Sequence, residues 1–259
     1  MSGCDLFVPL PGQAIDWTAF TVVIPSVSVG NVPQLAVDLL INSLLERKQV
    51  QLVGRIRTPC FRPIAGPNPY DIFSPHPSSS CEVYVSSVHK LVILQIRTPP
   101  FPETKVQLIQ TLSKWILDQQ FSRTVVLSSS FSQCLTEPDL DISGQTIKYV
   151  LTTSAAGAES ALEKSGSRRL SPQQITTSST ESFRLPGSGF GLTLFHKLEE
   201  SGLNAVLLVS FCSEGDNRPE AASLVGLVAS ALFGMDCNRW VEPVSWTDMF
   251  GSEKRSDIF

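Results

Sequence analysis

The sequence predicts a layered α/β sandwich in which a mostly parallel sheet is flanked by helices. Short runs rich in β-branched residues alternate with longer amphipathic stretches, which is the order of strands and crossover helices in such a sheet. Hydrophobic residues make up 42% of the 259 residues, which excludes a chain that is disordered throughout. A chain of this length can bury about 70% of its extended surface, enough for a full core without disulfides or a structural metal.

The chain opens with a strand, a loop and a helix. Residues 19–24 are short, apolar and β-branched, and therefore predict a buried strand. A helix is expected to begin after Asn31 as the N-cap, with Pro33 in its first turn. Asp38 lies on the flank of this helix away from its apolar stripe, so we expect it to face solvent or an interface.

The next segment predicts strands around a proline-rich loop, followed by a second helix. Residues 50–53 predict a strand, and proline fixes an extended loop over residues 58–77. Residues 81–85 and 91–96 predict a strand pair joined by a turn. Residues 103–120 predict an amphipathic helix. Its residues at helical spacing are Val106, Ile109, Leu112 and Ile116.

The second half of the chain predicts further strands and helices around one unusual segment. Eleven of the 28 residues in 153–180 are Ser or Thr and none is aromatic, so we expect a short helix and then a flexible insertion that buries little. Buried strands are predicted at 123–127, 147–151 and 204–211, and helices from Gly191 to about Glu200 and over 219–233.

The domain organisation follows from these elements. Residues 1–250 are expected to form one domain, since Trp240, Trp246 and Phe250 give the segment after Asn238 enough apolar surface to pack. Residues 251–259 are mostly polar and predict a mobile C-terminal tail.

Charge and cysteine content exclude several classes. Twenty Lys and Arg against 24 Asp and Glu give a net charge of −4, which argues against a general nucleic-acid binder. The apolar stretch 221–235 is too short to span a bilayer, and no basic residue precedes Arg47, so neither a membrane partner nor a secretory signal is expected. The six cysteines contain no C-x-x-C pair and predict reduced thiols. We therefore expect a soluble cytoplasmic and nuclear protein.

Two small-residue motifs suggest chemistry, and each has a structural alternative. Gly187, Gly189 and Gly191 resemble a phosphate cradle at a helix N-terminus, although the spacing differs from G-x-G-x-x-G; the alternative is a tight turn that lets two elements pack closely. The serines 128–130 follow a predicted strand, where sites gather, but lack a G-x-S-x-G context; the alternative is that they cap a following helix or turn.

The remaining candidates give no convincing active site. Glu214 and Asp216 could bind a metal or serve acid–base chemistry, but Asp216 or Asn217 as an N-cap, with Pro219 in the first turn, explains the same pattern. The three histidines show no zinc spacing. No catalytic, cofactor-binding or metal residue is expected, and elimination favours a binding module.

Several blocks of the sequence resemble the proteasome assembly chaperone family. Residues 24–39 resemble the opening strand–helix unit of that family. The other blocks keep their order along the chain and are residues 66–70, 82–84, 90–92, 126–130, 184–189, 213–217, 239–240, 245–246 and 250–252. Each block alone is weak, and their combination is specific.

The resemblance implies a fold related to the purine nucleoside phosphorylase type without its catalytic residues. It also implies a chaperone for assembly of the proteasome core particle. Such a protein forms a heterodimer with proteasome assembly chaperone 1, binds the alpha ring, promotes its correct formation and prevents off-pathway association of alpha subunits. The competing class is a nucleoside- or phosphate-binding hydrolase or phosphorylase-like enzyme, which would use the glycine loop and the loop with Glu214 and Asp216.

Partner contacts are expected in the loop 26–32, the first helix and the loop 213–217. The candidate residues are Ser28, Val29, Asn31, Glu214, Asp216 and Asn217. The family also implies that a C-terminal tail can insert into a pocket between alpha subunits, where its carboxylate meets a lysine. The usual pattern there is hydrophobic–Tyr–any residue. Asp257, Ile258 and Phe259 depart from it but keep two apolar side chains, so Ile258 and Phe259 are further candidates.

Overall fold

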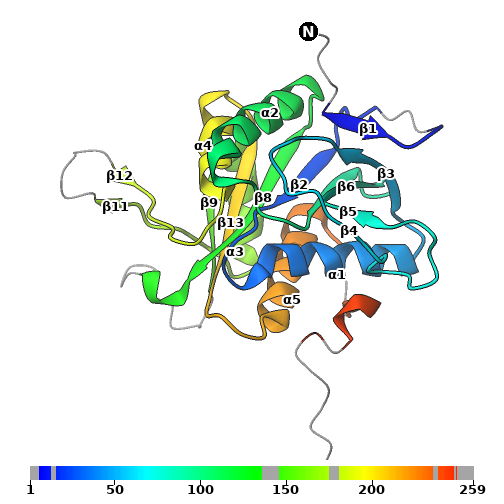
Figure 1. Ribbon diagram of the computed structural model, residues 1–259. Coiled ribbons are helices and arrows are strands. Elements are labelled where there is room, and N and C mark those ends of the chain that lie inside the picture. Colours follow the sequence, from blue (N-terminus) through cyan, green and yellow to red (C-terminus); the bar gives the residue numbers. More distant parts are fainter. Residues whose placement is uncertain are drawn as a thin grey trace, which may run out of the picture.

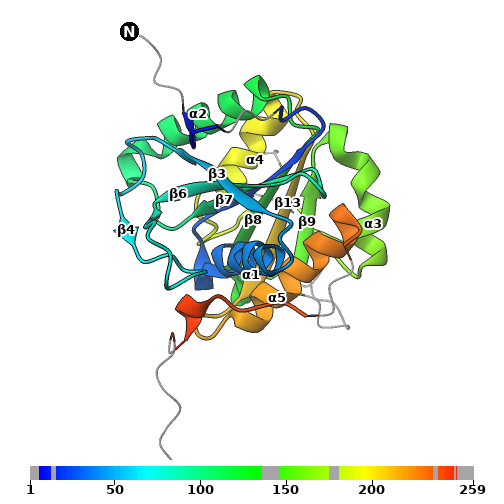
Figure 2. The same ribbon diagram turned by 90° about the vertical axis from the view of Figure 1, so that its right-hand side faces the viewer.

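The structure is a computed structural model that describes residues 6–12, 16–135, 146–174, 181–235, 239–247 and 249. A nine-stranded sheet forms the middle layer of this part of the chain, and helices cover both faces of the sheet (Figures 1 and 2). The predicted α/β layering is therefore confirmed, while the relation to the purine nucleoside phosphorylase type stays a prediction.

The centre of the sheet is parallel. It contains β2 (Thr21–Pro25), β7 (Leu91–Ile96), β8 (Arg123–Phe131) and β13 (Ala205–Cys212) in the order β7-β2-β8-β13. All eight residues of β13 are buried, because helices lie on both faces. In many open α/β sheets, ligands bind in a crevice outside the carboxyl ends of such parallel strands.

On one flank the sheet is an antiparallel meander. β3 (Gln51–Ile56) pairs with β6 (Cys81–Ser86), and β6 pairs with β7 across the turn that was expected between them. β1 (Phe7–Pro9) lies outermost and pairs with β3. The proline-rich loop between β3 and β6 holds a small separate pair, β4 (Ala65–Gly66) with β5 (Ser78–Ser79).

On the other flank β9 (Ile147–Leu151) runs antiparallel to β13, and β10 (Arg168–Arg169) forms the outer strand. A second small pair, β11 (Gln173–Gln174) with β12 (Glu181–Ser182), stands outside the main sheet. The sheet as a whole is therefore parallel at its centre and mixed at its flanks.

One face of the sheet carries α1 (Val32–Glu46), α3 (Glu159–Lys164) and α5 (Arg218–Leu227), which a π-helical turn continues to Leu232. α1 lies between the sheet and α5, so its residues from Val32 to Leu44 are buried except for Gln34. The expectation that the first helix offers a contact surface is therefore wrong, because one face of this helix packs against the sheet and the other packs against α5.

The other face carries α2 (Lys105–Asp118) and α4 (Gly191–Glu200). α2 buries Leu108, Ile109, Leu112, Trp115 and Ile116. Val106, expected on this stripe, is 67% exposed. At 100° per residue Val106 lies about 120° from the centre of the buried stripe, which explains its exposure.

Residues 153–170 bury several side chains against the sheet, although we expected residues 153–180 to bury little. Leu162 of α3 is fully buried, and the small residues Ala155 and Ala158 are also in the core. Ser167 donates a buried hydrogen bond from Oγ to the carbonyl of Ile147. Residues 175–180, which belong to the predicted insertion, lie outside the described residues.

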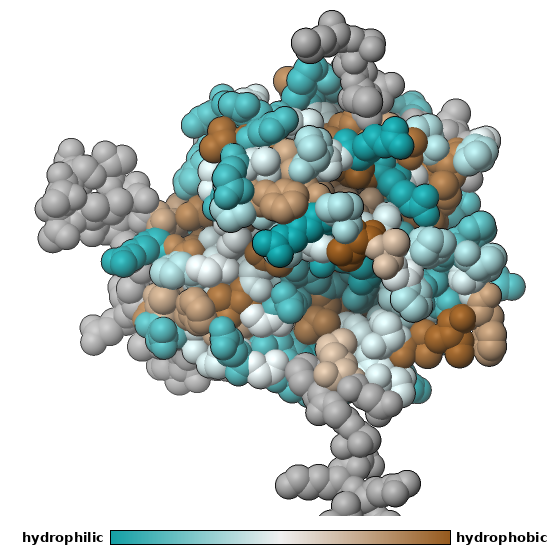
Figure 3. Space-filling view, viewed as in Figure 1, coloured by the Kyte–Doolittle hydropathy of each residue, from teal (hydrophilic) through white to brown (hydrophobic). Residues whose placement is uncertain are grey.

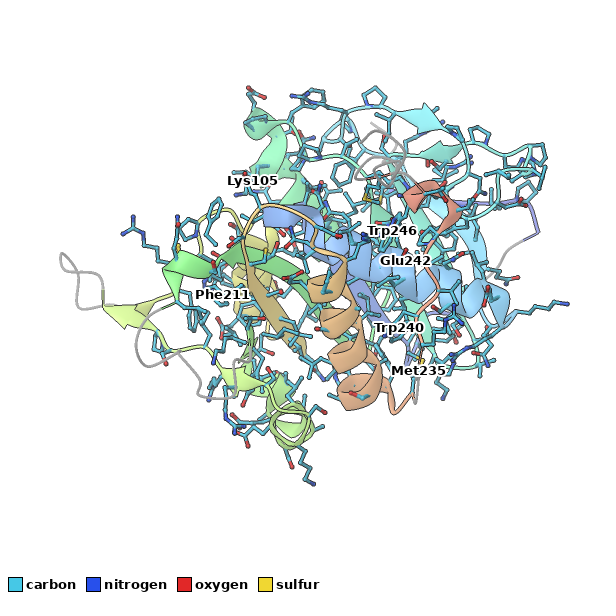
Figure 4. All side chains as sticks on the ribbon, turned by 90° about the horizontal axis from the view of Figure 1, so that it is seen from below. Lys105, Phe211, Met235, Trp240, Glu242 and Trp246 are labelled. Carbon is cyan, nitrogen blue, oxygen red and sulfur yellow. The ribbon has the colours of Figure 1, made fainter. Side chains whose placement is uncertain are left out.

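Residues 239–247, called the strap below, run across α1 and α5 (Figure 4). Asn42 of α1 donates to the carbonyls of Val241 and Glu242 at 3.1 and 3.0 Å, and the amide of Val241 donates to Ser43 Oγ at 2.9 Å. Trp246 is buried in the core. The packing of Trp240 and Trp246 is thus confirmed, whereas Phe250 and the predicted tail 251–259 lie outside the described residues.

Asp38 does not face solvent or an interface, contrary to expectation. It is 5% exposed and accepts hydrogen bonds from Tyr70 Oη and Gln95 Nε2, both at 2.6 Å, and from Arg97 Nη2 at 3.1 Å. Burial, and then the Asp38 carboxylate, raise the pKa of Tyr70 well above its usual value, so the phenol remains the donor. The cluster joins α1, β7 and the proline-rich loop.

Replacing Asp38 by alanine tests this cluster. The Asp38→Ala variant leaves the mostly buried Arg97 guanidinium without its carboxylate, so we expect the free energy of unfolding to fall by about 3–5 kcal/mol. The matched control Asp118→Ala breaks an exposed pair with Lys114 and should cost no more than about 0.5 kcal/mol. Urea titrations followed by circular dichroism measure both; equal losses would contradict the buried role of Asp38.

Candidate functional site

The carboxyl ends of β2, β8 and β13 meet at one edge of the sheet, and four loops gather there. They are residues 26–31, 132–135, 183–190 and 213–217. In an open α/β sheet this edge is the usual place for a site. What the edge can do depends on whether its polar groups are free or already bonded.

Ser26 closes the crevice at the end of β2. Its buried Oγ accepts hydrogen bonds from the amides of Phe190 and Gly191 at 2.9 and 3.0 Å and donates to the carbonyl of Ser188 at 2.8 Å. The first amides of α4, which would hold a phosphate in a nucleotide site, are thus bonded to a serine hydroxyl. The side chain of Lys105 adds a bond to the carbonyl of Gly189 at 2.8 Å.

The serines 128–130 lie inside β8, not after it, so the expectation that they cap a following helix or turn is wrong. β8 continues to Phe131 because each hydroxyl finds a carbonyl in a neighbouring loop. Ser128 donates to Ser188 at 3.0 Å, and Ser130 donates to Pro186 at 2.7 Å. Ser129 donates to the carbonyl of Val29 at 2.5 Å. These hydroxyls attach loops to the strand.

Gly187 and Gly189 form a tight turn that lets two segments pack closely. This is the alternative to a phosphate cradle that the sequence left open. A Cβ added at Gly189 would lie 2.1 Å from the carbonyl oxygen of Val27 and 2.4 Å from Ser26 Oγ. At Gly187 it would meet the side chain of Val29 at 2.3 Å. Both glycines have positive φ, 66° and 78°, which favours glycine further.

The structure brings the two predicted contact loops together. Gly30, between Val29 and Asn31, packs so closely on Asn217 that an added Cβ would lie 2.4 Å from its Nδ2. Ser28 and Val29 are half-buried, Asn31 and Glu214 are exposed, and Asn217 is buried. Asn31 precedes α1 as expected, with φ of 52° and without a side-chain hydrogen bond to the helix.

Asp216 serves the start of α5. Its Oδ1 accepts from the amide of Arg218 at 3.1 Å, and its carboxylate pairs with the guanidinium of the same residue at 2.6 Å. The hydrogen bond from Arg218 lowers the pKa of Asp216. Asn217 occupies the N-cap position and Pro219 follows in the first turn, which confirms the structural interpretation of this motif. Ile258 and Phe259 lie outside the described residues.

Sequence reasoning missed a second exposed surface, at the tip of the proline-rich loop. Phe73 is 86% exposed and Ile72 is 63% exposed. In Figure 3, apolar surface appears at the right, on the side where this loop runs in Figure 1. Proline is frequent in this segment and predicted an extended loop, so only the exposure in the structure singles out these two residues.

Hydrogen bonds within the loop, and from the loop to α1 and the strap, hold the loop tip in place. Asn68 Oδ1 accepts from the amide of Tyr70 at 2.9 Å, and Asp71 Oδ1 accepts from the amide of Phe73 at 2.9 Å. Tyr70 is bonded to Asp38, and the strap contributes a bond from the amide of Ser245 to the carbonyl of Pro69 at 3.1 Å. The two exposed apolar side chains are therefore presented on an ordered turn.

The described part of the chain shows neither a metal site nor a membrane span. Its histidine, cysteine and acidic side chains form no group of three that could hold a metal ion. Cys60, Cys81, Cys134 and Cys212 are free thiols. No described helix is long and apolar enough to cross a membrane.

Alanine substitutions at two glycines test the closed crevice. Gly189 and Gly202 have nearly the same φ, 66° and 68°, but nothing lies within 4 Å of a Cβ added at Gly202. We expect Gly202→Ala to cost about 1 kcal/mol of unfolding free energy from strain alone. Gly189→Ala should cost at least about 2 kcal/mol more, because the Val27 carbonyl must move. Equal effects in urea titrations would show that the contact can relax freely.

Comparison with known proteins places the fold and the chain. The model of the PAC2 family matches residues 22–242. The chain is 31% identical over 265 residues to proteasome assembly chaperone 2 of Xenopus laevis, covering 98% of this chain and all of that one, and 32% identical over 263 residues to that of Homo sapiens, covering 95% and 97%.

Among solved structures, Pyrococcus furiosus PbaA, an archaeal homolog of proteasome-assembly chaperone, superposes with a TM-score of 0.60 at 14% identity. The match covers 90% of this chain and 88% of that one, and shows a shared fold. The family match and the near full-length similarity to several relatives agree. The chain therefore belongs to the PAC2 family, among relatives named proteasome assembly chaperone 2.

Proposed function

We propose that this chain is a chaperone for assembly of the proteasome core particle. It acts as a heterodimer with proteasome assembly chaperone 1, binds the alpha ring, promotes its correct formation and prevents off-pathway association of alpha subunits. The observation that carries the proposal is the similarity to proteins named proteasome assembly chaperone 2. For five of these relatives the similarity covers 93–98% of this chain. The place of action is the cytoplasm and the nucleus.

The geometry of the carboxyl edge supports binding and not turnover. The amides at the start of α4 are bonded to Ser26, and the hydroxyls of Ser128 and Ser129 are bonded to loop carbonyls. A phosphorylase or hydrolase would need some of these groups to receive phosphate or a nucleophile. The mechanism that fits is the covering and alignment of neighbouring proteins.

Two surfaces are available for that role. The first is formed by the adjacent loops 26–31 and 213–217, with Asn31, Glu214 and Asp216 exposed. The second is the loop tip with Ile72 and Phe73. Stable interfaces bury about 1,600 Å² in total and depend on a few apolar or aromatic anchors, which the loop tip provides. Insertion of Ile258 and Phe259 into an alpha-ring pocket stays a prediction.

Serine substitutions at the loop tip test this proposal. The double variant Ile72→Ser, Phe73→Ser should recover at least about tenfold less partner chaperone and alpha subunit from cells, since loss of a central aromatic anchor costs about 2 kcal/mol or more. Its melting temperature should stay unchanged because both side chains are exposed. The measurement is affinity purification followed by quantitative mass spectrometry.

The matched control is Val106→Ser, which removes an apolar side chain of 67% exposure from α2. It should bind like the wild type. If the wild type recovers no proteasome subunit, the proposed function fails. If the double variant recovers as much as the control, the function stands and the loop tip is not a contact surface.

A further inference from the structure

A hollow of about 310 Å³ opens at the edge of the sheet, where β1 lies against the end of β3. We call it the edge hollow. Its apolar lining residues with accessible surface are Val8, Pro9, Leu10 and Pro63, and the buried residues Ile56, Phe61 and Cys81 also line it. Burial raises the pKa of the Cys81 thiol, so this side chain is a neutral apolar group at neutral pH. Much of the lining is thus apolar. The volume of the edge hollow is about that of the smallest ligand sites.

Among the described residues, the charged groups that line the edge hollow have one sign. They are Arg55 and Arg57, and no described Asp or Glu lines it. Arg57 is exposed and forms no ion pair with another described residue. Arg55 lies opposite Glu82 in the β3–β6 pair and donates from Nη2 to the carbonyl of Pro77 at 3.4 Å. Its Nε has no hydrogen-bond partner among the described residues, and the same is true of Ser79 Oγ. The net charge of the chain is −4, so this cationic lining is not a property of the whole surface.

The edge next to the hollow is not built to receive another strand. β1 is the outermost strand of the sheet and ends at Pro9, which lines the hollow and has no amide hydrogen to donate. An incoming polypeptide therefore has to enter the hollow with its side chains or its end. It cannot extend the ladder along all of β1.

We propose that the edge hollow binds the C-terminal residue of a protein partner, with its apolar side chain on the floor and its free carboxylate at Arg55 and Arg57. A carboxylate suits two guanidinium groups because charge-assisted hydrogen bonds to arginine are strong and directional. The apolar floor selects a residue such as leucine over a polar one. This site is separate from the loop tip and from the loops 26–31 and 213–217, and it does not depend on the proposed function.

A second hollow on the same molecule provides a matched control. It measures about 250 Å³ and is lined by Lys48, Val50, Val85 and Val88. It too combines apolar walls with a cation. It has a single lysine, which is a point charge, in place of two arginines that can bind both carboxylate oxygens.

The test is a titration of the full chain with acetyl-Gly-Ser-Gly-Leu, followed by amide NMR shifts and isothermal calorimetry. Shifts should concentrate at Val8, Ile56 and Ser79. The same peptide with a C-terminal amide, or with serine in place of leucine, should bind at least about fivefold more weakly. Arg57→Gln should weaken binding of the acid peptide by at least about fivefold, and Lys48→Gln should leave it unchanged.

Each other outcome overturns the proposal. Equal binding of the amide peptide removes the role of the carboxylate, and shifts centred on Lys48 place the peptide in the other hollow. If isocaproate, the acid without a peptide, binds as tightly as the tetrapeptide, the site takes a small carboxylate and not a protein terminus. Arg57 is exposed, so its variant should keep the wild-type melting curve; Arg57→Lys, which keeps the charge, should bind between the wild type and Arg57→Gln.

Discussion

The arrangement of the loops at the carboxyl ends of the strands depends on the hydrogen bonds of the Ser26 hydroxyl. It stands at the end of the central strand β2 and bonds to three backbone groups around the start of α4. That contact requires the chain at Gly189 to approach Val27 more closely than any side chain would allow. It fills the crevice that comparable sheets leave open for ligands. The edge is left with surface loops whose shape is fixed from within.

The strands were largely predictable from the sequence, and the polar interior was not. β9 has the predicted bounds, and β2 and β13 are displaced by one or two residues, because runs of β-branched residues have few other stable conformations. The serines of β8 misled the prediction because their burial depends on carbonyls in loops some 60 to 100 residues away. Asp38 misled it likewise, since its partners come from two other segments of the chain.

The candidate site was predictable only where it is local. The start of α5 at Asp216 and Asn217 follows from helix-capping chemistry within a few residues. The adjacency of the loops 26–31 and 213–217 follows from the sheet order, which places β2 and β13 on either side of β8. The exposure of Phe73 and the edge hollow depend on how distant segments pack. The bond from Tyr70 to Asp38 holds the loop tip in one conformation. Binding of a partner therefore costs less conformational entropy than it would with a flexible loop.

The strap imposes an order on how the protein is made. Asn42 and Val241 are bonded across 199 residues of sequence, and the aromatic ring of Trp246 completes the core that α1 needs. At a translation rate of about 5–20 residues per second, α1 waits about 10–40 s on the ribosome before the strap is synthesised. During that interval the sheet and α5 can already cover α1, but Asn42 and Ser43 lack their partners in the strap. The last bonds of α1 therefore form only when translation is almost complete.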